Sequence, residues 1–100
     1  MSRELIVLTS EKPSLDLQAL ISPPLQAAGN DVFDAEGRLL LRVQEPVLIS
    51  IAGEAERLLG IDSPTPVWWT EIHTATASPE AHHLAQRCAE TLNGTIWTAP

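Results

Sequence analysis

The chain has 100 residues, of which 44% are hydrophobic, and its 13 acidic and 6 basic side chains give a formal net charge of −7. This length predicts one domain, residues 1–100, with a single core, and the apolar fraction excludes intrinsic disorder. Few cationic groups can displace phosphate counterions, so nucleic-acid binding is not expected. Apolar runs such as Val47–Ile51 are too short to span a bilayer, so no membrane association is expected.

The N-terminal segment and the cysteine content bear on the compartment. A single Arg3 precedes a short apolar run, Leu5–Leu8, and Glu11 follows without a small-residue cleavage site. This pattern does not predict a signal peptide. Cys88 is the single cysteine, so no internal disulfide can form. We therefore expect a cytoplasmic protein, whose evenly spread acidic charge indicates either simple solubility or docking on a basic partner protein.

The first third of the chain predicts a strand followed by a helix. Glu4–Thr9 is a short run of branched apolar residues, which favours a buried strand. Ser14 is placed to cap a helix over Leu15–Ile21. Pro23-Pro24 ends or kinks that helix. The turn Leu25–Ala28 either resumes the helix or lies outside it, and both alternatives stay open.

The middle of the chain predicts a β-hairpin. Asp31–Asp34 and Leu39–Gln44 are short strand candidates, and Ala35–Arg38 between them contains the glycine that a turn favours. Pro46 interrupts the pattern, which resumes as a strand over Val47–Ile51. This last strand either extends the hairpin past Pro46 or adds an edge strand.

The last part of the chain predicts a strand, a helix and a strand. Gly53–Gly60 is expected to be a short helix, and Ile61–Pro66 an extended linker with two prolines. Val67–Thr76 is the longest strand candidate. Ser78–Asn93 predicts a helix, because it begins with a capping hydroxyl, a proline and an acid and ends before a glycine. Thr95–Thr98 predicts the last strand.

The order of these elements predicts the fold class. The hairpin is enclosed by two similar units. Each unit consists of a strand, a helix that begins at a serine, a stop that contains glycine, and a second strand. We therefore predict a small α+β domain with a ferredoxin-like, split βαβ arrangement. Its mostly antiparallel sheet of four to six strands would carry two main helices on one face, plus a short extra helix. The prediction depends on element order alone, and this fold hosts enzymes, regulators and structural modules alike.

The usual catalytic and metal-binding patterns are not found in the sequence. Cys88 falls on the apolar stripe of its helix, which indicates a core residue remote from the positive end of the helix dipole. His82 and His83 fall off that stripe and diverge by about 100° around the helix, so they do not converge on one ion. No nucleophile elbow and no phosphate-binding glycine loop occurs. We therefore assign no catalytic residue, metal ligand or cofactor and do not favour an enzyme.

The longest predicted strand contains the candidate binding residues. Strict alternation sends Trp68 and Trp69 to opposite faces, with Glu71 and His73 on the face of Trp69. Trp68 is expected in the core. Trp69 either packs under the helix Gly53–Gly60, with both polar residues in water, or stacks against a ligand or partner that they orient. A third interpretation makes His73 a general base.

Three functions follow as hypotheses. The leading one is a non-enzymatic protein-interaction or regulatory binding module, which acts on a basic partner or associates with itself. The second is a small-molecule-binding domain or enzyme that uses a cleft near Trp69, Glu71 and His73. The third is an immunity- or antitoxin-like inhibitor of a basic protein.

Overall fold

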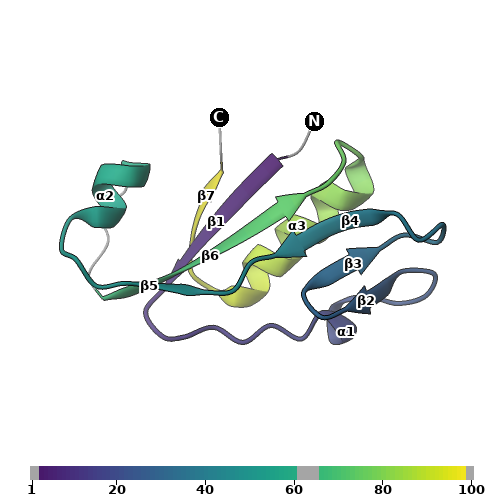
Figure 1. Ribbon diagram of the computed structural model, residues 1–100, viewed down its shortest axis with the longest axis horizontal. Coiled ribbons are helices and arrows are strands. Elements are labelled where there is room, and N and C mark those ends of the chain that lie inside the picture. Colours follow the sequence, from purple (N-terminus) through teal and green to yellow (C-terminus); the bar gives the residue numbers. More distant parts are fainter. Residues whose placement is uncertain (1–2, 61–65, 99–100) are drawn as a thin grey trace.

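The computed structural model describes residues 3–60 and 66–98, which form one α+β unit of seven strands and three helices (Figure 1). Most of the predicted linker, residues 61–65, lies outside the described residues. The elements in chain order are β1 (Arg3–Thr9), α1 (Leu17–Leu20), β2 (Gln26–Ala28), β3 (Asp31–Phe33), β4 (Leu39–Val43), β5 (Val47–Ile49), α2 (Glu54–Leu59), β6 (Val67–Thr74), α3 (Pro79–Leu92) and β7 (Thr95–Thr98).

All seven strands belong to one antiparallel sheet, in the order β2-β3-β4-β6-β1-β7, with β5 also paired to β6. The sheet is therefore larger than the predicted four to six strands. β4 places Val43 opposite Ile72, and β5 places Val47 opposite Trp69. Because β1 occupies the other side of β6, β4 and β5 follow each other along one side of it. The segment after Pro46 thus extends the hairpin strand.

The ferredoxin-like arrangement with two main helices is not confirmed. β6 and β7 both pair with β1, and α3 connects them, as in a split βαβ unit. The connection from β1 to β4, however, contains only the four-residue helix α1 and the strands β2 and β3. One long helix therefore covers the sheet where two were predicted.

The first predicted helix is the main error in the secondary structure. Helix α1 begins after Asp16, whose side chain accepts a hydrogen bond from the backbone N–H of Gln18 at 3.1 Å, so Asp16 and not Ser14 is the cap. Pro23-Pro24 then forms a turn, closed by the bond from Leu25 N–H to Ser22 C=O at 3.1 Å. Prolines lack the N–H that a helix needs. The following residues pair with β3 as β2 and do not resume the helix.

Helix α3 forms as predicted and lies close to β1. The Ser78 hydroxyl accepts from the Ala81 N–H at 3.2 Å, and Asn93 ends the helix in a left-handed conformation with φ 56°. Gly94 then passes the backbone of β1 so closely that a Cβ there would lie 2.2 Å from the carbonyl oxygen of Leu8. A residue without a side chain is therefore required at this approach.

The core is divided between the two faces of the sheet. Figure 1 shows α3 running along one face, whereas α2 lies at the far end, next to β5. A small second cluster lies on the opposite face from α3, and its members are Ile6, Leu8, Ala55 and Val67, packed against Ile49, Leu59, Trp69 and Trp97. The main cluster fills the space under α3, and its buried members are Leu5, Val7, Leu17, Val32, Leu40, Leu41, Val43, Ile72, Ala81, Leu84, Ala85, Cys88 and Ala89.

The outline of the molecule is long and thin, with extents of 44 × 26 × 17 Å. Helix α2 covers only one end of the second face. Among the described residues, 3–60 and 66–98, no other helix covers the rest of that face. None of the described helices combines the length and apolar character that crossing a membrane requires.

Candidate functional site

The three candidate residues of β6 form a chain of hydrogen bonds on the face opposite α3. The indole N–H of Trp69 donates to Glu71 Oε2 at 3.0 Å. The imidazole Nε2 of His73 donates to the other oxygen of the same carboxylate, also at 3.0 Å. The side chains of Glu71 and His73 are each 35% exposed. Glu71 therefore links an aromatic ring to a titratable group at a solvent-accessible position.

Glu4 of β1 joins this group, and sequence reasoning missed it. The antiparallel register places Glu4 directly opposite His73. One ligand atom from each of Glu4, Glu71 and His73 lies within 4.8 Å of the other two. Carboxylates and imidazole are the nitrogen and oxygen ligands that zinc accepts, so these three residues could hold a cation. Alternation alone assigns Glu4 to a face of β1, but the pairing of β1 with β6 is needed to find its neighbours.

The carboxylate of Glu4 is affected by its surroundings in this group. The pKa of Glu4 is raised above its usual value, first because burial removes water from the carboxylate and then because of the negative charge of Glu71. His73 partly offsets this effect. The ionised form of Glu4 is therefore less stable in the folded protein than in water.

We expect Glu4→Gln to stabilise the protein at pH 7 by about 0.5 kcal/mol, the scale of one repulsive cross-strand pair that water screens. A raised folded-state pKa means that the folded state binds the proton more tightly, so stability falls as the pH rises through that pKa. The gain should therefore disappear at pH 3, where Glu4 is protonated in both states. Urea unfolding at the two pH values measures it.

Glu11→Gln is the matched control, because it removes the same charge from an exposed loop position. An equal gain for both variants at pH 7 would mean that only net charge matters. An equal gain for Glu4→Gln at both pH values would contradict the assigned repulsion.

A neighbouring ion pair continues the polar band across the same face. Arg42 of β4 lies opposite His73 in the register, and Asp31 of β3 lies opposite Arg42. The Arg42 guanidinium donates to both oxygens of Asp31, at 2.7 and 3.1 Å, and this contact lowers the pKa of Asp31. The charge of Arg42 is therefore balanced by Asp31 and not by the carboxylates of Glu4 and Glu71.

The two adjacent tryptophans differ in role, and the expectation for Trp68 is wrong. Trp69 packs against the second cluster, which contains Ala55 of α2, as in the interpretation that placed it under that helix. Trp68 belongs to neither cluster, is half-buried, and carries Lys12 Nζ at 5.7 Å from its ring centroid. Helix α3 ends at Leu92, which lines the same cavity as Thr70.

The helix α3 holds the other residues that were considered. Cys88 is fully buried in the core, as predicted, and burial raises the pKa of its thiol to about 11. A thiol in this state stays protonated near neutral pH and is a poor nucleophile or metal ligand. His83 is exposed and His82 is half-buried.

A stretch of exposed apolar side chains lies from β5 to α2, and sequence reasoning did not identify it. Among the residues that the structure describes, the exposed large hydrophobic side chains are Val47, Leu48, Ile51 and Leu58. Their exposed fractions are 55%, 47%, 68% and 48%. We call them the β5–α2 patch. The run Val47–Ile51 is as apolar as a buried strand, so its sequence pattern does not reveal its exposure.

Comparison of the chain with models of known protein families, with curated proteins and with solved structures found no match. The arguments for function therefore depend on the geometry of the described residues.

Proposed function

We propose that the protein is a non-enzymatic interaction module, which binds an extended apolar segment of a basic partner protein along the outer edge of β5. The observation that carries this proposal is the β5–α2 patch, because its four exposed apolar side chains lie within one short stretch of the chain. Val47 and Leu48 stand on the two faces of the sheet at one edge, and apolar exposure that is confined to one edge favours an added strand as the partner.

The backbone of β5 supports binding of a strand. Among the described residues, β5 pairs with β6 and has no strand on its other side. Its residues Val47–Ile49 include no charge and no proline, the features with which proteins usually protect an edge strand. Val47 is paired with Trp69 and Leu48 with Trp68, so the two side chains project from opposite faces of the sheet. An added strand would gain backbone hydrogen bonds and contacts to both side chains.

Charge favours a basic partner over a second copy of the chain. Glu45 precedes β5, and Glu54 and Glu56 begin α2. Arg57 pairs with Glu54, whereas Glu56 is exposed to solvent. A second copy would bring another net charge of −7 to the same surface. Lysine or arginine residues beside an apolar segment would instead complement these acids.

The test uses a synthetic nine-residue peptide with two lysines at each end and alternating valine and threonine between them. Leu48→Lys should weaken its binding at least tenfold in a calorimetric titration, because an apolar contact is lost and a like charge is added. Leu48 is about half exposed, so folding should persist. Ala28→Lys is the matched control: it adds the same charge at an exposed position of the edge strand β2, and binding should be unchanged.

Two results would contradict the proposal. One is equal weakening by Leu48→Lys and Ala28→Lys, since charge alone would then explain the effect. The other is equal binding of a peptide that has glutamates in place of the lysines. A dimer in sedimentation that Leu48→Lys dissociates would replace the basic partner with a second copy of the chain.

A second candidate function is binding of a small cationic molecule at Glu4, Glu71 and His73. Burial and the negative charge of Glu71 both raise the pKa of Glu4, and this environment, unfavourable for a carboxylate, favours a positive ligand at this position. Such a ligand would change the fluorescence of Trp69, whose indole N–H is bonded to Glu71. His73→Ala should weaken that response, whereas His83→Ala, on the exposed side of α3, should not.

A further inference from the structure

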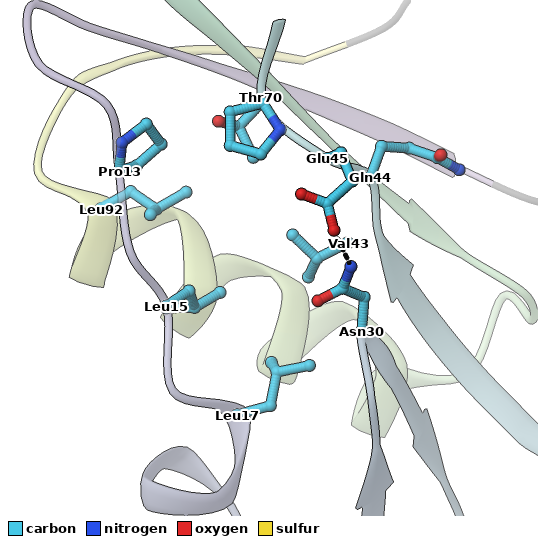
Figure 2. Close-up of a pocket in the computed structure, with 10 residues that line it drawn as sticks. Pro13, Leu15, Leu17, Asn30, Val43, Gln44, Glu45, Thr70 and Leu92 are labelled. Atoms are coloured by element: carbon cyan, nitrogen blue, oxygen red, sulfur yellow. Dashed lines mark hydrogen bonds between the residues drawn. The ribbon is translucent and has the colours of Figure 1, made fainter.

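A cavity of about 110 Å³ lies beside the break between β4 and β5 (Figure 2). Val43 pairs with Ile72 and Val47 with Trp69, so residues 44–46 lie opposite residues 70 and 71, one residue more than β6 provides. Gln44 N–H still donates to Glu71 C=O at 2.8 Å, so the extra residue and Pro46 interrupt the pairing with β6 only after Gln44. The loop before α1 and the end of α3 close the space, through Pro13, Leu15 and Leu92.

The hydroxyl group of Thr70 is the unusual feature of this cavity. Thr70 lines the cavity and is only 2% exposed, and its Oγ1 has no hydrogen-bond partner among the described residues. Figure 2 shows this oxygen directed toward the side on which Pro13 lies. A buried hydroxyl without a partner is costly, and native proteins nearly always provide one. The position therefore suits the polar group of a bound molecule.

The other lining residues define which molecule fits. Six apolar residues line the cavity together with four polar ones, of which Asn30, Gln44 and Glu45 are exposed residues at its rim. The side-chain amide of Asn30 donates to Glu45 Oε1 at 2.8 Å and holds that carboxylate in place. Lysine, arginine and histidine do not occur among the lining residues. An anion would therefore be repelled, and a positive group is favoured next to Glu45.

We propose that this cavity binds a short amino alcohol, with its hydroxyl bonded to Thr70 Oγ1 and its ammonium group next to Glu45. The volume would hold several water molecules, or a ligand of about four to six non-hydrogen atoms. Thr70 and Glu45 line the same small cavity, which suits a short chain between the two groups. The cavity shares Glu45 with the acids beside β5, but its Thr70 hydroxyl lies outside the β5–α2 patch, so Thr70→Val tests the cavity without changing the proposed protein interaction.

Three probes of nearly equal size test the proposal: ethanolamine, ethylene glycol and glycolate. They place a positive, a neutral and a negative group beside the same hydroxymethyl group. In ¹H–¹⁵N NMR titrations, ethanolamine should give saturable shifts for residues that line the cavity, with a dissociation constant on the order of 1 mM, as for a very small ligand. Ethylene glycol should bind more weakly and glycolate not measurably. Shifts that do not saturate, or equal affinities for the three probes, would overturn the proposal.

Two variants then assign the groups. Thr70→Val keeps the shape of the side chain and removes its hydroxyl. It should weaken the binding of ethanolamine about tenfold, the effect of one lost hydrogen bond. Glu45→Gln should remove the preference for ethanolamine over ethylene glycol, whereas Glu36→Gln, in the remote turn before β4, should preserve it. The dispersion of the amide signals shows whether each variant is folded. Wild-type affinity in folded Thr70→Val would overturn the proposal.

Discussion

Replacing Gly94 with alanine is expected to lower the free energy of unfolding by about 2–3 kcal/mol, the scale of severe overpacking. The new Cβ would lie 2.2 Å from the carbonyl oxygen of Leu8 and 2.8 Å from Cγ2 of Thr9. The first of these atoms belongs to the backbone of β1, which is hydrogen-bonded on both sides, to β6 and β7. Relief therefore requires movement of a central strand or of the end of α3. Urea unfolding measures the change.

Gly37→Ala is the matched control for this substitution. Gly37 has φ 78°, and a Cβ there would meet nothing within 4 Å, so alanine introduces only the cost of a left-handed backbone, about 1–2 kcal/mol. If Gly94→Ala were no more harmful than Gly37→Ala, the close approach between the end of α3 and β1 would be refuted.

Trp69→Ala is expected to destabilise the protein by about 3 kcal/mol, near the lower end of the range for large core residues, because Trp69 is only half-buried. Its ring packs against the second cluster, which includes Leu8 and Ala55. Removal of the ring would open this cluster to water and leave Glu71 without the indole donor. Trp69→Phe retains most of the ring and should cost about 1 kcal/mol, the scale of one hydrogen bond.

Trp68→Ala provides the comparison for this prediction. Trp68 belongs to neither cluster, and its ring contacts Lys12, an exposed cation. Such exposed cation–π contacts contribute about 0.5–1 kcal/mol, so the variant should lose markedly less stability than Trp69→Ala. Thermal unfolding of both variants distinguishes the two roles. A larger loss for Trp68→Ala would restore the original expectation that Trp68 is the core residue.

Local patterns predicted the elements whose signals are independent of their surroundings. The capping group Ser78, the proline after it and the stop at Asn93 define α3 within the chain itself. Alternation along β6 also predicted that Trp69, Glu71 and His73 share a face, which the hydrogen bonds between them reflect.

Features that depend on distant segments could not be predicted. The neighbours of Glu4 are determined by the pairing of β1 with β6, which are separated in the chain by the strands and helices from α1 to α2. Residues Gln26–Ala28 form a strand because β3 provides a pairing edge, although alanine and glutamine favour helices. The absence of Trp68 from both clusters depends on tertiary packing, which alternation along β6 does not show. Tertiary contacts overrode local preference in each case.

The break between β4 and β5 also divides the molecule mechanically. Beyond it, β5 is held to the sheet by β6, and α2 is held by the small cluster around Ala55, whereas β4 shares the main core with α3. The segment from β5 to α2 can therefore detach as a local opening that leaves the larger core intact. Its amide protons would then exchange with solvent sooner than those of β1, and a partner bound along β5 would slow that exchange.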